Sequence, residues 1–235
     1  MNLMSVFKET KTAVWLVLAP FTVVVTLLGL HHVWLTFVGY HLVICLVLPL
    51  LDSLLSKRIR LWEHLRVVGL RGPRCRAGIL AGTSLGLVLG AGTVALFDWW
   101  GGSFLAGNQV NDVLASWRVE PDQIILLIVV MVVGNGMAEE LFWRGYIHHR
   151  LESVRPRRRA LGVTALFYAS YHIVTIGWFI ANCWVIVLFT CVVVAAGLLW
   201  GWLREYYGNV WPALLGHVGA TAGYMTVYWR WIVNG

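Results

Sequence analysis

Seven apolar runs, each about as long as a bilayer is thick, constrain what this chain can fold into. A transmembrane helix needs about 20 consecutive, mostly apolar residues. Because 59% of the 235 residues are hydrophobic and only 12% are charged, no stretch is left for a separate soluble domain. We therefore predict an all-α, polytopic transmembrane helical bundle in which residues 1–235 form one integral-membrane domain. The predicted spans are residues 13–30, 33–55, 78–98, 122–147, 160–178, 180–202 and 210–231.

The basic residues predict how the bundle is oriented, since cytoplasmic loops of membrane proteins carry an excess of Lys and Arg. With a cytoplasmic N-terminus, the inner segments hold fifteen basic residues and the outer segments hold only Arg118 and Arg230. The formal charge of +7 is therefore expected to face anionic lipid. We do not expect nucleic-acid binding, because no known nucleic-acid-binding module accompanies this charge. The inner residues are Lys8, Lys11, Lys57, Arg58, Arg60, Arg66, Arg71, Arg74, Arg76, Arg150, Arg155, Arg157, Arg158, Arg159 and Arg204.

Two of the predicted loops differ in character. Residues 56–76 alternate basic and apolar side chains, which predicts an interfacial helix on the inner leaflet. Residues 99–121 contain glycine and asparagine, and we expect an irregular outer loop there.

A stripe of glycines marks the third predicted span. Gly78, Gly82, Gly86 and Gly90 recur at intervals of four, so they share one helix face. Small residues on one face let a second helix approach closely. We favour packing inside the bundle, because a bundle of this size has many internal helix contacts. A homodimer through the same four glycines is the alternative.

Two carboxylates and a guanidinium lie near one end of the fourth span. A charge at the centre of a spanning helix costs at least ~2.5 kcal/mol, and such residues are usually paired or functional. Glu140 and Arg144 are one helical turn apart, which predicts an ion pair. Glu139 is rotated by about 100° from Glu140 on a helix of about 3.6 residues per turn. Glu139 is therefore the carboxylate that is free for chemistry.

Two histidines lie inside later spans at a depth similar to that of Glu139. His172 is in the fifth span and His217 is in the seventh, and both spans start from the cytoplasmic side. A lone buried histidine is more often a core residue than a catalytic one, but polar groups in hydrocarbon tend to meet, so we predict one shared site. His41, in the second span, is a weaker member of the same class. Four further histidines fall at span ends and are expected to be interfacial: His31, His32, His148 and His149.

Glu139, His172 and His217 together can hydrolyse an amide. A buried carboxylate can take a proton from water while that water attacks a carbonyl. One imidazole can orient the water, and the other can stabilise the oxyanion. Tyr168 precedes His172 by four residues and Thr221 follows His217 by four, so each pair shares a helix face.

The same groups could instead bind a divalent metal such as zinc. Against a metal site, the sequence contains no HExxH motif. An ion pair with Arg144 would also remove Glu140 from the set of ligands. We therefore expect no metal, and zinc stays the alternative.

These motifs resemble those of the CPBP family, the CAAX-prenyl-protease and bacteriocin-processing (Abi-like) intramembrane endopeptidases, which include the Ras-converting enzymes. The family pattern is EExxxR, then FxxxH, then HxxxN or HxxxD, each on a different helix. In this chain Tyr replaces Phe in the second motif, and Thr replaces Asn or Asp in the third. The resemblance covers residues 67–225, which we expect to be the protease core. The motif positions are Glu139, Glu140, Arg144, Tyr168, His172, His217 and Thr221.

The resemblance implies an intramembrane endopeptidase that acts on a protein or peptide near the cytoplasmic face. It implies that Glu139 activates water, that His172 assists, and that His217 with Thr221 forms the oxyanion side. The family has been described both as metallopeptidases and as glutamate proteases. The second is favoured here, because Glu140 and Arg144 share a helix face and leave Glu139 free. Whether the substrate is prenylated stays open. We expect a bacterial or archaeal plasma membrane.

Two other classes of function remain. A catalytically inactive relative could bind a peptide or confer immunity, and the changes at Tyr168 and Thr221 keep this alternative open. A small transporter could use the buried charges as a proton relay. The chain shows no convincing internal repeat of the kind that many transporters have, which disfavours the transporter.

Overall fold

The computed structural model describes residues 3–56, 58–100 and 107–233, and every regular element in these ranges is helical. This confirms the predicted all-α bundle. In chain order the helices are α1 (Leu3–Val24), α2 (Val33–Thr36), α3 (Leu48–Leu51), α4 (Leu61–Val67), α5 (Cys75–Trp100), α6 (Gly107–Ser116), α7 (Ile124–Val129), α8 (Gly136–Glu140), α9 (His148–Glu152), α10 (Arg157–Ser170), α11 (His172–Phe179), α12 (Cys183–Tyr207) and α13 (Trp211–Tyr228).

Several of these helices are parts of longer rods. Wider π-helical turns connect or extend them, and a 3₁₀ turn at Pro121–Gln123 leads into α7. π-Helical turns are rare in proteins overall, and those that occur are often found at functional sites. The π-helical segments are Val25–Gly29 after α1, Phe37–Val47 between α2 and α3, Asp52–Ser56 after α3, Val130–Asn135 between α7 and α8, Leu141–Ile147 between α8 and α9, and Trp229–Val233 after α13.

Within the described residues, six helical rods are long and apolar enough to cross a membrane, and they agree with the first six predicted spans within a few residues at most ends. The chain is therefore an integral membrane protein. The seventh predicted span, residues 210–231, corresponds to α13, which is helical but is not among these six rods. Many of the α13 side chains are buried. The six rods are Thr10–Gly29, Val33–Ser56, Cys75–Trp99, Pro121–Glu152, Arg157–Phe179 and Cys183–Tyr207.

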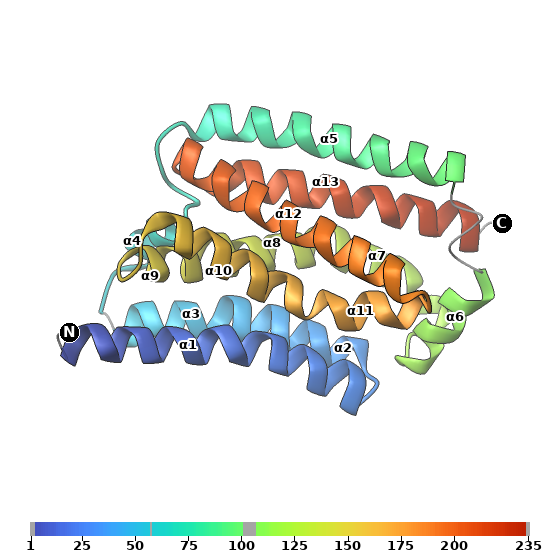
Figure 1. The fold of residues 1–235 in the computed structure, drawn as a ribbon, viewed down its shortest axis with the longest axis horizontal. Helices are drawn as coiled ribbons and strands as arrows, with labels where there is room; N and C mark the ends of the chain where they lie inside the picture. Colours follow the sequence, from blue (N-terminus) through green and yellow to red (C-terminus); the bar gives the residue numbers. More distant parts are fainter. Residues whose placement is uncertain (1–2, 57, 101–106, 234–235) are drawn as a thin grey trace.

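The rods stack in a flattened bundle, with α5 and α13 along one edge and α1 with the α2–α3 rod along the opposite edge (Figure 1). The N-terminus, α4 and α9 lie at one end, and α6 and the C-terminus lie at the other (Figure 1). The predicted inner loops around α4 and between α9 and α10 therefore share one end of the bundle. Helix α4 lies in the basic loop, as predicted.

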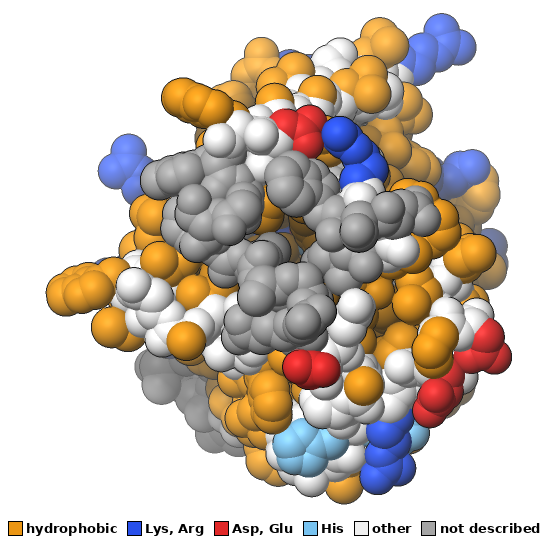
Figure 2. All heavy atoms as spheres, turned by 90° about the vertical axis from the view of Figure 1, so that its right-hand side faces the viewer, with side chains coloured by type: hydrophobic (Ala, Val, Ile, Leu, Met, Phe, Trp, Pro, Cys, Tyr) orange, Lys and Arg blue, Asp and Glu red, His pale blue; other side chains and the backbone are white. Residues whose placement is uncertain are grey.

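At the opposite end of the bundle, the structure differs from one prediction, that of an irregular outer loop. We expected residues 99–121 to be irregular, but α6 lies within them. Val110, Val113 and Trp117 are buried, so an apolar face of this segment packs on the bundle. Figure 2 shows that this end presents a few separate charged side chains of both signs among hydrophobic ones.

The glycine stripe of α5 packs against α13 of the same chain. A Cβ added to Gly86 would lie 2.5 Å from the carbonyl oxygen of Leu215, and one added to Gly219 would lie 2.3 Å from the Cα of Gly86. Gly90 and Gly223 face each other in the same way. The predicted internal packing is confirmed, and the homodimer through Gly78, Gly82, Gly86 and Gly90 would use a face that α13 already covers.

We expect Gly86→Ala to lower the thermal stability of the protein, while Gly92→Ala on the same helix leaves it unchanged or raises it. The added methyl at Gly86 meets backbone atoms, whereas a Cβ at Gly92 would meet nothing within 4 Å. Overpacking costs about 1–3 kcal/mol, while Gly→Ala in an open helix gains up to about 1 kcal/mol. Melting temperatures of both variants in detergent test this, and equal temperatures would contradict the close contact.

The start of α13 is fixed by the turn that precedes it. Gly208 ends α12 in a left-handed conformation, with φ of +69°, as glycine often does at a helix C-terminus. The buried Asn209 then accepts a hydrogen bond from Trp211 N at 3.2 Å and donates one to Pro73 O at 2.8 Å. This turn therefore ties the first turn of α13 to the segment before α5, and it sets where the side chains of α13 project.

Candidate active site

The two adjacent glutamates are buried together with Arg144. Glu139 is 2% exposed, and Glu140 and Arg144 are less exposed still. Arg144 Nη1 donates to Glu140 Oε1 at 2.8 Å, so the predicted ion pair is present. Arg144 Nη2 also donates to Gly197 O at 3.2 Å, which connects this pair to α12.

The two oxygens of Glu139 have different surroundings. Oε1 accepts a hydrogen bond from the Tyr171 hydroxyl at 2.8 Å and lies 3.6 Å from His41 Nε2. Oε2 is buried, has no hydrogen-bond partner among the described residues, and lies 3.9 Å from His217 Nε2. Glu139 is therefore held on one side and open to a further partner on the other.

His217 bridges the two carboxylates. Its Nδ1 lies 3.0 Å from Glu140 Oε1, and its Nε2 faces Glu139 Oε2. Because a carboxylate oxygen only accepts, Nδ1 carries the proton of this hydrogen bond, and Nε2 of a neutral ring has a free lone pair. The ring is parallel to Trp200 at 6.5 Å between centroids, so α12 helps to fix its plane.

His172 is in the same region but makes no ion pair with Glu139 within 4.0 Å. Its Nδ1 donates to Tyr168 O at 2.9 Å, and its ring lies 4.5 Å from the Tyr171 ring. Tyr171 lies between α10 and α11, so this junction carries both the tyrosine that contacts Glu139 and His172. His172 is only partly buried, and it is more exposed than Glu139 or His217.

The two residues that depart from the family pattern pack next to these groups. The Tyr168 ring lies under the Arg144 guanidinium at 4.2 Å and 6.1 Å from the His217 ring. Thr221 is fully buried, and its hydroxyl makes no hydrogen bond of normal geometry with any described residue.

The side of Glu139 that faces His41 and Asn135 was predicted only weakly from the sequence. His41 Nε2 lies 2.6 Å from Asn135 Oδ1, and Asn135 precedes Glu139 by four residues on the same rod. Tyr171, which contacts the carboxylate, and Tyr40, which contacts Tyr171, were also missed. The available signals were the spacing of Asn135 from Glu139 and the positions of the tyrosines directly before His41 and His172.

Three hydrogen bonds in series lead to Glu139. Trp143 Nε1 donates to the Tyr40 hydroxyl at 2.9 Å, Tyr40 donates to the Tyr171 hydroxyl at 2.9 Å, and Tyr171 donates to Glu139 Oε1. Each hydroxyl accepts one hydrogen bond and donates the next. The series therefore holds Oε1 as an acceptor.

The prediction that His148 is interfacial is wrong, because this residue is fully buried. Its Nε2 lies 3.1 Å from Glu205 Oε1 and 3.3 Å from Glu152 Oε1. Among the described residues these three make the one group with metal-ligand spacing, and Glu139, His172 and His217 are not in it. Arg157 and Arg204 pair with the two carboxylates of the group, so an ion-pair network accounts for it.

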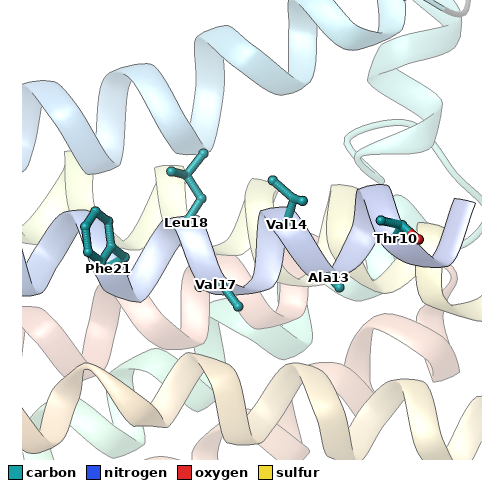
Figure 3. Close-up of a pocket in the computed structure, with 6 residues that line it drawn as sticks. All are labelled: Thr10, Ala13, Val14, Val17, Leu18 and Phe21. Carbon is teal, nitrogen blue, oxygen red and sulfur yellow. The ribbon is translucent and has the colours of Figure 1, made fainter. Parts of the chain in front are cut away.

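Two surface hollows lie away from Glu139. One is formed by a single face of α1, where its lining side chains project from the same helix (Figure 3). The other lies between α1, α9 and α10 and is also mainly apolar. Such surfaces suit contact with acyl chains. The first hollow is lined by Thr10, Ala13, Val14, Val17, Leu18 and Phe21.

Comparison with known proteins bears on the same residues. Residues 121–223 match the family model described as Rce1-like, type II CAAX prenyl endopeptidase. No curated protein and no solved structure matches the chain. The matched segment runs from the 3₁₀ turn before α7 into α13, and it contains every motif position from Glu139 to Thr221. The part of the chain that carries these motifs thus matches the CAAX prenyl endopeptidases, the membrane-protease family that the motifs resemble.

Proposed function

We propose that this protein is an intramembrane endopeptidase that hydrolyses a peptide bond with a water molecule activated by Glu139 and His217. The observation that carries the proposal is the pair Glu139 Oε2 and His217 Nε2, which belong to two buried residues and lie 3.9 Å apart. Oε2 makes no hydrogen bond with the described residues. Two polar atoms at this separation can both contact one bridging water.

Both atoms can accept a proton from that water. One hydrogen of the water points to Glu139 Oε2 and the other to His217 Nε2, which leaves an oxygen lone pair for the carbonyl carbon. As the O–C bond forms, Glu139 takes one proton, and the carbonyl oxygen becomes an oxyanion. The C–N bond then breaks, and the leaving amine takes the proton from Glu139.

The contacts around Glu139 and His217 support these roles. The Tyr171 hydrogen bond occupies Glu139 Oε1, which leaves Oε2 to act as the base. Glu140, paired with Arg144, orients His217 through Nδ1. The Nδ1 of His172 is tied to a backbone carbonyl, so Nε2 is the ring nitrogen that remains for a substrate. We therefore assign His217 to the water and His172 to the substrate.

The cleavage site is proposed to lie near the cytoplasmic face of the membrane. The basic residues of the predicted inner loops support this orientation, since they share the end of the bundle that carries α4 and α9. The family description supports a prenylated CAAX end as the first substrate to test. A bacterial or archaeal plasma membrane is the proposed location.

A direct experiment uses the purified protein in lipid nanodiscs and an internally quenched peptide with a farnesylated CAAX end. We expect cleavage in H₂¹⁸O to place one ¹⁸O in the new C-terminal carboxylate, as measured by mass spectrometry. The same peptide without the farnesyl group tests whether the lipid is recognised. Binding of the farnesylated peptide without cleavage would contradict the enzyme and favour a peptide-binding relative.

We also propose that the hydrolysis needs no metal. The donor atoms at the site support this, because Glu140 Oε1 is engaged by Arg144 and His217, and Glu139 Oε1 by Tyr171. A cation bound to either of these Oε1 atoms would have to displace or share these partners, which leaves Glu139 Oε2 and His217 Nε2 as the open pair of ligands.

Dialysis against a strong chelator is expected to leave the cleavage rate of the peptide unchanged. Loss of activity that zinc restores would contradict the metal-independent mechanism. The cluster of His148, Glu152 and Glu205 could confound this result. A Glu152→Gln variant is the control, since a chelator effect that disappears in it arises at the cluster and not at Glu139.

A further inference from the structure

His41 and Asn135 form a largely buried polar pair that the mechanism above does not use. His41 lies in the Phe37–Val47 segment, and Asn135 lies one helical turn before Glu139. His41 Nε2 is 2.6 Å from Asn135 Oδ1 and 3.6 Å from Glu139 Oε1. Two acceptor oxygens therefore face one ring nitrogen.

This arrangement fixes the state of the imidazole. Because amide and carboxylate oxygens only accept, His41 Nε2 must carry a proton that points between Asn135 and Glu139. The ring itself is held by aromatic neighbours, with centroids 5.0 Å from Phe37 and 4.6 Å from Tyr40. Its Nδ1 is buried and makes no hydrogen bond with the described residues. Nε2 is therefore the ring nitrogen through which His41 makes its polar contacts.

We propose that His41 and Asn135 are positioning residues that hold the Glu139 carboxylate with Oε2 turned toward His217. Asn135 anchors the His41 N–H, and the same N–H, together with the Tyr171 hydroxyl, keeps Glu139 Oε1 in place. Without this support the Glu139 side chain can rotate about its terminal bond, and Oε2 leaves the water site. The inference rests on the proposed function of Glu139.

The consequence reaches beyond the segment that matches the family. His41 comes from the second rod, whereas the family match begins at residue 121. Tyr40, in the same rod, contributes to the series of hydrogen bonds that ends on Glu139. The second rod is therefore part of the catalytic apparatus and does more than cover the protease core.

The test compares two replacements at His41 with the farnesylated peptide as probe. His41→Phe keeps an aromatic ring of similar size but removes the Nε2 donor, and we expect kcat to fall roughly 10- to 100-fold with KM within about threefold, since misplacing a catalytic group by about 1 Å can cost 10²-fold. His41→Gln places an amide N–H close to the position of Nε2 and should restore most of kcat. His32→Gln, at a histidine that makes none of these contacts, is the matched control.

A double-mutant cycle separates positioning from simple packing. If the two residues act as one unit, His41→Phe combined with Asn135→Ala should be no slower than the slower single variant. If the fold losses of kcat in the two single variants multiply in the double variant, the proposal is wrong. It is also wrong if His41→Phe keeps full kcat, or if His41→Gln is no faster than His41→Phe. Because Glu139→Gln reports on the proposed function separately, inactive Glu139→Gln with fully active His41→Phe would reject this inference alone.

Discussion

Replacing Glu139 with Gln should lower kcat for peptide cleavage by about 10²–10⁴-fold, the contribution typical of a general base. The carboxamide keeps the shape of the side chain, and its oxygen can still accept the Tyr171 hydrogen bond. It cannot take a proton from water. The melting temperature should therefore change little, which distinguishes loss of chemistry from loss of folding.

The measurement is the initial rate of cleavage of the farnesylated peptide, with circular dichroism melting of the same preparation. Glu120→Gln, at an exposed glutamate that starts the same rod, is the control for removal of a carboxylate. Wild-type activity in Glu139→Gln would reject Glu139 as the base. Proton-dependent uptake by proteoliposomes that Glu139→Gln abolishes, with no peptide cleavage, would instead support the transporter.

The second large effect is expected from the neighbouring ion pair, and it concerns stability. Glu140→Ala should destabilise the protein by about 3–5 kcal/mol, because it leaves the Arg144 guanidinium buried without its carboxylate. Arg144 is 1% exposed, and its Nε already makes no hydrogen bond with the described residues. The expected readouts are a lower yield of folded protein and a lower melting temperature.

A combined variant tests the reason for this loss. Glu140→Gln with Arg144→Met removes both charges, so it should be more stable than Glu140→Ala alone. Its activity should still be low, because His217 Nδ1 loses the carboxylate that orients it. A combined variant less stable than Glu140→Ala would contradict the buried ion pair as the source of the effect.

The sequence predicted the helical elements and the ion pair for identifiable reasons. The apolar runs are continuous, and charge in hydrocarbon must be paired, so the spans and the Glu140–Arg144 contact follow from local spacing. The glycine stripe likewise indicated a close helix contact. The helix that covers the stripe is α13. This could not be predicted, because the spacing of residues within one rod does not say which other rod packs on it.

The partners of Glu139 were predicted less completely. His217 was expected near Glu139, but the helical wheel of one rod cannot show that His217 also contacts Glu140, or that His41 from a distant rod lies closer to Glu139 than His172 does. Tyr171 was missed because it lies in the break between α10 and α11. The burial of His148 was missed because its position at the end of a predicted span gave no sign of Glu152 and Glu205 around it.

The series from Trp143 to Glu139 also determines where protons can travel. An indole N–H gives a hydrogen bond but accepts none, so the series is closed at its far end and cannot conduct protons across the membrane. Oε2, the oxygen that has no hydrogen-bond partner among the described residues and faces His217, is the side of Glu139 left open for proton exchange with a water. In the proposed mechanism, a proton that Glu139 takes from water therefore leaves with the products of the same turnover, which suits a hydrolase better than a carboxylate that shuttles ions between two compartments.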